Sequence, residues 1–353
     1  MLGGLLHVAL LILPAAARIR QSDRDALYRL YELTGGAHWQ QNTNWEPEGD
    51  PCVRSHRWAG VGCIDPCDRW RDGETCDFGR VTALNLDGNN LTGSLTLWTE
   101  VGELTNLSIV DMSFNALSGS LPTELGRINN LAFLSVARNS LEGPIPTELG
   151  EINQPDVVEN LRDLDLSRNR IAGPLPTELA VHTQLNYLDA RDNSLEGALP
   201  TELAHLTDLQ VLHLEDNAGL GGTLPAALGQ VSRLRYLYAS HTSVSGTVPP
   251  SIGALRLLQT LHLEAAALSG SLPAELCELD QLRSLKLADN RLVGPAPLPS
   301  HSFTAAPSQL CPRTSSSPAH LSTSRLTTCA WAGRQPARAY RQAAQSQPAR
   351  HIQ

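Results

Sequence analysis

The sequence is poor in lysine and in aromatic residues. Among its 353 residues Lys286 is the only lysine, and 5% are Phe, Trp or Tyr. Leucine, alanine and valine supply most of the apolar content, as is typical of repeat arrays rather than of globular enzymes. Residues 298–353 contain six arginines and no Asp or Glu, so the formal charge of −9 divides into −15 before this tail and +6 within it. An acidic body argues against nucleic acid as the main partner, since phosphate binding needs a basic face.

Motifs of common enzyme classes are absent as well. The sequence contains no GxSxG, HExxH or P-loop motif and no kinase segment. We therefore expect a non-enzymatic protein that needs no cofactor.

One apolar run stands at the N-terminus, in residues 1–17, MLGGLLHVALLILPAAA. It ends in three alanines and is too short to span a membrane, so it predicts a cleaved signal peptide, with a buried or anchoring segment as the alternative. No later segment resembles a membrane helix. Cys52, Cys63, Cys67 and Cys76 lie in one loop-rich segment, as expected of a disulfide-stapled cap in an oxidising compartment. These features favour a secreted or cell-surface protein.

The body of the chain repeats with a period close to 24 residues. Aligned on the residue that opens each xxLxLxxN pattern, nine units begin at Val81, Leu107, Leu131, Leu161, Leu185, Leu209, Leu234, Leu258 and Leu282. A single unit has one apolar face and cannot fold alone, so neighbouring units must stack to close a continuous core. Unit three is six residues longer than the others, around EINQPDVVEN, which predicts a surface loop.

Each unit can be interpreted position by position. In LRDLDLSRN, Leu164 and Leu166 alternate with polar residues, which predicts a short strand with its leucines inward. The ninth position is asparagine in seven units, and a short amide there predicts a hydrogen-bonded ladder between stacked turns. Thr242 and Ala266 replace it in units seven and eight, so we expect the ladder to be weaker there. A recurrent glycine that follows suits a positive φ or a close backbone approach.

The repeated LPTELG motif raises the question of carboxylate chemistry. Its glutamates are Glu124, Glu148, Glu178 and Glu202. Acid–base catalysis needs carboxylates that converge on one substrate, whereas these form a column on an exposed edge. We therefore expect them to open short helical turns, where a carboxylate is favoured by the dipole and the preceding proline fixes φ.

These units resemble the plant-type leucine-rich repeat, LxxLxLxxNxLxGxLPxxLxxLxx. The resemblance implies an α/β repeat solenoid, a curved superhelix with a parallel sheet on its concave face and short 3₁₀ or irregular turns on its convex side. We expect a signal peptide in residues 1–17, a cysteine-rich cap with one helix in 18–80, nine repeats in 81–297 and a disordered basic tail in 298–353.

The segment before the repeats resembles the N-terminal cap of the same family. Ser22 with Asp25 predicts the start of a helix that Gly35 and Gly36 stop. The motifs NTNW, DPC and RWAGVGC follow, and the resemblance implies a disulfide between Cys52 and Cys63. An inserted segment adds Cys67 and Cys76, which we pair locally, although four cysteines allow three connectivities. Cys277 has Cys311 as a candidate partner, or is a buried free thiol.

The residues that face outward from the predicted sheet are free of the demands of the core. Aromatic side chains and arginines are favoured anchors at protein interfaces, so we predict a ligand-binding surface on the concave face. Its candidate residues are Phe133, Arg138, Arg168, Tyr187, Arg191, His213, Tyr236, Tyr238, His241 and His262. The alternative is an ordinary solvated face. His213 and His262 stand about 10 Å apart across two strand spacings, too far to share one metal ion, so we expect no metal site.

The functional hypothesis is an extracellular recognition module that binds a peptide, protein or glycan on the concave face. It resembles a receptor-like ectodomain, for which a membrane-bound co-receptor is a further partner. A secreted inhibitor of cell-wall-degrading glycosidases, such as polygalacturonase, and a structural wall or matrix protein are the alternatives. Asn90 and Asn106 begin Asn-x-Ser/Thr sequences and are predicted N-glycosylation sites if the chain is secreted.

Overall fold

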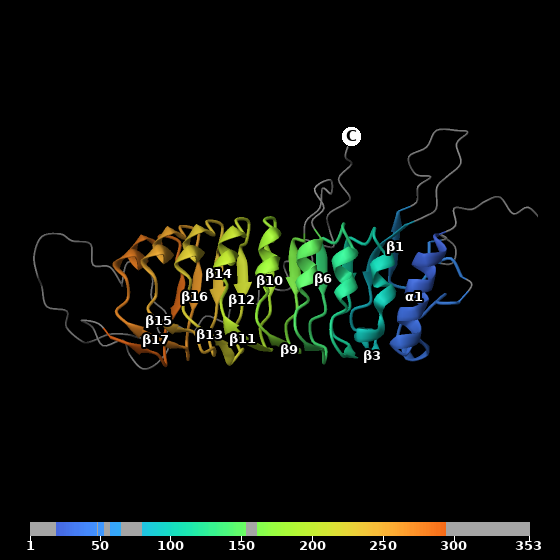
Figure 1. Ribbon diagram of the computed structural model, residues 1–353, viewed down its shortest axis with the longest axis horizontal. Helices are drawn as coiled ribbons and strands as arrows, with labels where there is room; N and C mark the ends of the chain where they lie inside the picture. The colour runs from blue at the N-terminus through green and yellow to red at the C-terminus, as the bar shows by residue number, and fades with distance from the viewer. Residues whose placement is uncertain (1–18, 48, 53–56, 65–79, 153–160, 294–353) are drawn as a thin grey trace, which may run out of the picture. The chain divides into compact units, whose positions relative to one another are not determined.

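The computed structural model describes residues 19–47, 49–52, 57–64, 80–152 and 161–293. The expected signal peptide, the second cysteine pair, most of the long loop of unit three and the basic tail lie outside these residues. Figure 1 follows the described chain from the N-terminal helix α1 (Gln21–Leu33) to the last repeat.

One large sheet runs through the described repeats. Its ten strands follow one another in chain order, with β1 antiparallel to β2 and every later pair parallel. They are β1 (Val61–Ile64), β2 (Arg80–Asn85), β4 (Ile109–Asp111), β6 (Phe133–Ser135), β8 (Asp163–Asp165), β10 (Tyr187–Asp189), β12 (Val211–His213), β14 (Tyr236–Tyr238), β16 (Thr260–His262) and β18 (Ser284–Lys286).

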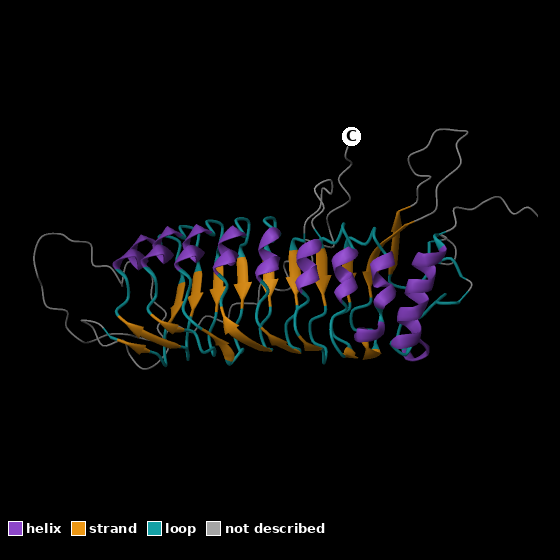
Figure 2. Cartoon of the chain, viewed as in Figure 1, coloured by secondary structure: helices purple, strands orange, loops and turns teal. Residues whose placement is uncertain are grey.

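In units one to eight the return half carries a 3₁₀ turn, shown in purple in Figure 2, and a further turn, η1 (Gly36–His38), lies in the cap. In each of these units a short strand, shown in orange, lies in sequence between the strand of the large sheet and the turn that follows it. The turns are η1 (Gly36–His38), η3 (Leu95–Leu97), η4 (Thr99–Glu103), η5 (Thr123–Arg127), η6 (Thr147–Glu151), η7 (Thr177–Val181), η8 (Thr201–His205), η9 (Ala226–Gln230), η10 (Pro250–Ala254) and η11 (Ala274–Glu278). The short strands are β3 (Thr92–Ser94), β5 (Ala116–Ser118), β7 (Glu142–Gly143), β9 (Arg170–Gly173), β11 (Ser194–Ala198), β13 (Gly219–Gly221), β15 (Ser245–Gly246), β17 (Ala267–Gly270) and β19 (Arg291–Leu292). They pair into small parallel sheets, and the predicted α/β repeat solenoid is confirmed.

Leucine alternation builds the core as expected. Leu164 and Leu166 are fully buried, and their counterparts in neighbouring units stack on them in register. The polar residues between them face outward. Since neighbouring parallel strands lie about 4.8 Å apart, the apolar residues at each of these two positions, most of them leucines, form a continuous column through the stack.

The asparagine ladder is also present. The Asn193 side chain accepts a hydrogen bond from Ile171 N in the preceding unit and donates to the backbone oxygens of Leu166, Ala190 and Arg191. Each ladder asparagine from Asn115 to Asn217, and Asn290, repeats this pattern. It satisfies buried backbone groups that would otherwise be left unpaired.

The ladder weakens where the sequence predicts it. The Thr242 side chain donates to Ala239 O within its own unit, at 2.8 Å, and its only other hydrogen bond among the described residues is a long one of 3.5 Å from Val244 N. The Ala266 side chain has no polar group. The prediction for units seven and eight is therefore confirmed.

The Thr-Glu motifs open 3₁₀ turns, as expected. In η5 Pro122 is the N-cap and Glu124 lies in the first turn, beside Thr123. The glycine at the end of the motif permits close stacking, because a Cβ on Gly126 would stand 2.2 Å from Glu148 O of the next unit. The motif is thus architectural.

The N-terminal helix begins one residue earlier than Ser22 predicts. Its N-cap is Arg20, with no side-chain capping bond, so the Ser22–Asp25 prediction of the start is wrong. A tertiary contact holds this end instead, because Ile19 N donates to Asp50 Oδ2 at 3.1 Å. Gly35, at φ 71°, stops the helix as predicted.

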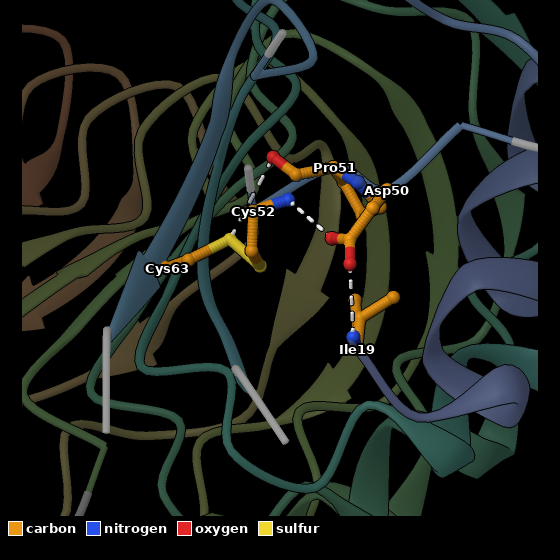
Figure 3. Close-up of a disulfide and its surroundings, with 5 residues drawn as sticks. All are labelled: Ile19, Asp50, Pro51, Cys52 and Cys63. Atoms are coloured by element: carbon orange, nitrogen blue, oxygen red, sulfur yellow. Dashed lines mark hydrogen bonds between the residues drawn. A yellow bond between two sulfur atoms is a disulfide. The ribbon is translucent and has the colours of Figure 1, made fainter. Parts of the chain in front are cut away.

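The disulfide between Cys52 and Cys63 is confirmed, with 5.6 Å between the two Cα atoms. Figure 3 shows Asp50 beside it, accepting hydrogen bonds from Cys52 N and from Ile19 N, so one carboxylate joins the helix start to the disulfide. Cys277 is disulfide-bonded as well, which excludes the free thiol; its partner lies outside the described residues.

Unit four contains an exception to its own repeat. His182 stands where the other units bury an aliphatic residue such as Ile128 or Leu206, and it is fully buried. Its Nε2 donates to Leu149 O at 2.8 Å. In the neighbouring turn Leu125 O accepts from Ile128 N, but Ile152 takes a right-handed helical conformation and gives Leu149 O no such bond. The histidine replaces the missing donor.

Candidate functional site

The outward face of the large sheet, here called the sheet face, is formed by the third and fifth residues of each unit. It is the face predicted to be concave. In strand register the third positions run Ile109, Phe133, Asp163, Tyr187, Val211, Tyr236, Thr260 and Ser284, and the fifth positions run Asp111, Ser135, Asp165, Asp189, His213, Tyr238, His262 and Lys286.

Aromatic rings contact one another across the sheet face, three of them at fifth positions and one at a third position. His213 stacks on Tyr238 with ring centroids 4.3 Å apart, and His262 meets the other side of Tyr238 edge-on at 4.9 Å. Tyr187 lies 6.2 Å from His213 on its opposite side. Four candidate residues from four consecutive strands thus form one aromatic row.

Three carboxylates stand beside this row, on β8 and β10. Asp165 and Asp189 are in register on neighbouring strands, and Asp163 lies two residues before Asp165 on the same face. Burial raises the pKa of Asp163 to about 6, against the opposing effect of Arg162. Burial, reinforced by the charge of Asp165, also raises the pKa of Asp189, although Tyr187 Oη donates to its Oδ2 at 2.8 Å. Asp189 is thus fully buried, whereas Asp163 and Asp165 are half-buried.

A partly buried ion network joins the carboxylates to the aromatic row. Arg191 lies 3.2 Å from Asp189 and 3.6 Å from Glu215, and Glu215 also meets His213 Nδ1 at 2.9 Å. Burial acts to raise the pKa of Glu215, but the hydrogen bond and charge of His213, with Arg191, outweigh it and hold the pKa below its usual value. Tyr187, Arg191 and His213 are therefore brought together, as predicted for one surface.

The far end of the row lies beside an ion pair. His262 Nε2 lies 2.8 Å from Ser284 Oγ, and Lys286 pairs with Glu264 at 3.1 Å. Burial, together with the charge of Lys286, lowers the pKa of His262 to about 4. His262 is therefore neutral at physiological pH and serves as an apolar and hydrogen-bonding surface.

Three predicted site residues lie elsewhere. Arg138, Arg168 and His241 occupy the eighth position, in the turn after each strand, and take positive φ values of 56°, 57° and 55°. Arg138 stacks over the Phe114 ring at 4.9 Å, and Arg168 pairs with Asp192 at 3.1 Å. They form an exposed column along the edge of the sheet face. Alternation could not reveal it, since a left-handed residue interrupts the strand.

The two remaining candidates lie at third positions. Phe133 is half-buried on β6 in register with Asp163, and Tyr236 donates to Gln259 Oε1 at 3.2 Å. Along the third positions, buried Val211 lies between Tyr187 and Tyr236, and sequence reasoning did not select it. The carboxylates were also left out of the candidate set, because alternation identifies outward positions without showing which of them neighbours bury.

The remaining predictions can be placed in the described parts of the chain. There, no group of three His, Cys, Asp or Glu side chains is arranged to hold a metal ion. No helix in those ranges is long and apolar enough to cross a membrane. Asn90 is exposed and donates to His38 O, and Asn106 is half-buried. Their glycosylation stays a prediction.

Family comparisons agree with the repeat. A model described as "Leucine-rich repeat region" matches residues 209–300, and one described as "Leucine Rich Repeat" matches residues 106–128 and 160–181. An Arabidopsis thaliana protein named "Probable inactive receptor kinase" is 35% identical over 118 residues, which cover 33% of this chain and 15% of that protein.

Solved structures of plant receptors are similar as well. The plant peptide hormone receptor RGFR1, in complex with RGF2, has 34% identity and a TM-score of 0.55 over 58% of this chain and 32% of the receptor chain. The Arabidopsis receptor kinase HAESA, in complex with the peptide hormone IDA and the co-receptor SERK1, has 25% identity and a TM-score of 0.57 over 77% of this chain and 46% of its own. The chain thus spans less than half the length of each of these relatives. With the repeat register, the asparagine ladder and the cap disulfide, these similarities support a plant-type leucine-rich-repeat protein.

Proposed function

We propose that this chain is a receptor-like extracellular recognition module that binds an extended peptide or protein segment along the sheet face. The observation that carries the proposal is the aromatic row of Tyr187, His213, Tyr238 and His262, which occupies outward positions on four consecutive strands. His213 is buried and the other three rings are half-buried, and rings packed in this way lose little entropy on binding, which makes them efficient interface anchors.

Similarity to plant receptors supports the class of ligand and the location. The RGFR1 and HAESA structures are complexes with peptide hormones, and the latter includes the co-receptor SERK1. By analogy, the proposed module acts outside the cell or at its surface, without catalysis of its own, and a membrane-bound co-receptor is a proposed second partner. A glycan ligand, inhibition of a glycosidase and a purely structural role stay predictions.

Selection from a displayed library of random 12-residue peptides tests the proposal. The full chain and its Tyr187→Ala/Tyr236→Ala/Tyr238→Ala variant are panned in parallel, after both show cooperative thermal unfolding. We expect peptides that the wild type enriches and the variant does not. Equal enrichment by both proteins, or none by either, contradicts recognition of peptides on the sheet face.

The same two proteins distinguish the inhibitor hypothesis. Each is added to a secreted polygalacturonase, whose activity is then measured. Inhibition by the wild type would replace the receptor-like interpretation with that of an inhibitor.

A further inference from the structure

The sheet face has an excess of negative charge at one place. Asp163, Asp165 and Asp189 occupy three corners of a square formed by two neighbouring strands, with Tyr187 at the fourth. We call this square the acidic square. Its corners are about 5 Å apart across strands and about 7 Å apart along a strand.

Compensation within the described residues is incomplete. Asp189 has Arg191 at 3.2 Å, but the same guanidinium is shared with Glu215. Asp165 Oδ1 accepts from Ser167 N and Oγ, which are neutral donors. No hydrogen bond or ion pair within the described ranges reaches the carboxylate of Asp163. Burying a carboxylate partly or fully without a cation of its own is unfavourable, and a docked positive charge would stabilise the ionised form.

A second observation at the same place points to a missing partner. Ser135 stands next to Asp165 in strand register and is fully buried, and its Oγ has no hydrogen-bond partner among the residues that the structure describes. Buried hydroxyls are normally paired, so this one offers an acceptor to a ligand N–H group. Beside Ser135 on the same strand, Phe133 is in register with Asp163 and supplies an apolar wall.

The other side of the acidic square leads into the aromatic row. Val211 is buried next to Tyr187, and His213 stacks on Tyr238 beyond it. From the middle of the square to Tyr238 is between two and three strand spacings, about 12 Å, which an extended chain covers in about four residues. A peptide segment that lies across the strands would therefore contact the acidic square with one residue and the aromatic row with another.

We propose that the acidic square docks the side-chain cation of an arginine or lysine in an extended peptide segment, and that an apolar or aromatic residue about four positions away packs on His213 and Tyr238. This inference rests on the proposed function and names the chemistry of its ligand. Arginine fits best, because its planar group of donors can serve two carboxylates and the Ser135 hydroxyl together.

Titration of the square gives an independent signature. The groups facing Asp163 and Asp189 are Arg162, Asp165, Tyr187, Arg191 and His213. Without a ligand, burial raises the pKa of both carboxyls. A bound cation lowers both pKa values again, so binding releases protons near pH 6 and weakens as the pH falls below 6.

The test uses the random 12-residue library on three forms of the full chain. They are the wild type, Asp163→Asn/Asp165→Asn and the matched control Glu178→Gln/Glu202→Gln, which removes the same charge from the 3₁₀ turns. We expect wild-type and control selections rich in Arg and Lys with an apolar residue about four positions away, and loss of that enrichment with Asp163→Asn/Asp165→Asn. An enriched peptide, resynthesised with its Arg replaced by neutral citrulline, should bind the wild type about 10- to 100-fold more weakly.

Replacing Arg by citrulline in the peptide should have little effect on its binding to Asp163→Asn/Asp165→Asn. If that variant does not fold, Asp163→Asn alone serves, since this carboxylate loses no hydrogen bond or ion pair within the described residues. Peptides without excess basic residues that still depend on Tyr187, Tyr236 and Tyr238 would overturn the acidic square and leave the proposed function standing. Enrichment that ignores those tyrosines would overturn both.

Discussion

His213 and Tyr238 lie face to face on neighbouring strands, with ring centroids 4.3 Å apart and ring planes 8° apart. The imidazole is held from a second direction by Glu215, 2.9 Å from Nδ1. The stack is thus ordered by contacts within the protein, so a ligand need not organise it, and most of the contact energy is available for binding.

The stack gives the first prediction. Tyr238→Ala should weaken the binding of an enriched peptide about 30-fold or more, because truncation removes a central aromatic anchor. Tyr238→Phe should change the affinity little, because it keeps the ring. Isothermal titration with both variants measures this. Equal effects of the two substitutions would assign the binding to the hydroxyl and contradict the role of the ring.

The second prediction concerns His182. Leucine at this position would match the aliphatic residues of the other units, yet His182→Leu removes the hydrogen bond to Leu149 O. We expect the variant to lose about 1–3 kcal/mol of unfolding free energy at pH 7.5, the cost of a buried unpaired carbonyl. Denaturant unfolding measures the difference, and a more stable variant would contradict the compensating role of the histidine.

The pH dependence of His182 adds to this result. Burial lowers its pKa, and its Nδ1 is buried without a partner, so protonation is unfavourable in the folded state. Its contribution to stability is complete above about pH 6.5 and is lost as the pH falls below that value. The cost of His182→Leu should therefore be smaller at pH 5 than at pH 7.5.

The third prediction concerns Asp163, whose effect has the opposite sign. Because its folded pKa is raised from 3.8 to about 6, it favours folding below pH 4, and this contribution is lost as the pH rises through 6. Asp163→Asn should therefore become more stable relative to the wild type between pH 4 and pH 7, by at most about 3 kcal/mol. Unfolding at the two pH values, with Glu178→Gln as control, measures this, and a constant difference would contradict the desolvated carboxylate.

The fourth prediction repairs the asparagine ladder. By analogy with Asn290, an Asn at position 266 would accept from Val244 N and donate to Ala239 O and Leu263 O. Ala266 is half-buried, so there is room for the amide. Ala266→Asn should add about 1 kcal/mol to the unfolding free energy. Thermal unfolding of Ala266→Asn is compared with that of Ala266→Ser, whose shorter side chain cannot reach the neighbouring unit. Equal stability of the two variants would contradict the contribution of the ladder.

The period alone predicts the repeat positions correctly. Leucines, ladder asparagines and Thr-Glu turns each repeat one local solution in every unit, so Leu164 or Asn193 behaves as its neighbours do. Departures from the repeat that depend on tertiary contacts cannot be predicted from the period. The helix begins at Gln21 because Ile19 is tied to Asp50, and His182 answers a backbone change at Ile152, far away in sequence.

The site was predictable only in part for the same reason. Alternation places Tyr187, His213 and Tyr238 outward, and strand spacing predicts that their rings can meet. It does not reveal that Asp189 is fully buried and Asp163 half-buried, since that depends on the side chains of neighbouring strands. Nor does alternation distinguish Arg138 and Arg168 from the outward residues of the strands, although the left-handed turn places both arginines at the edge of the sheet.

Recognition on the sheet face is the central claim, and hydroxyl-radical footprinting tests it most directly. The full chain is oxidised with and without a saturating enriched peptide, and the modification of each tyrosine is measured by mass spectrometry. We expect Tyr236 and Tyr238 to be protected by the peptide, while Tyr28, half-buried in the N-terminal helix, is modified equally in both samples. Unchanged modification of Tyr236 and Tyr238 in the saturated sample would contradict the account.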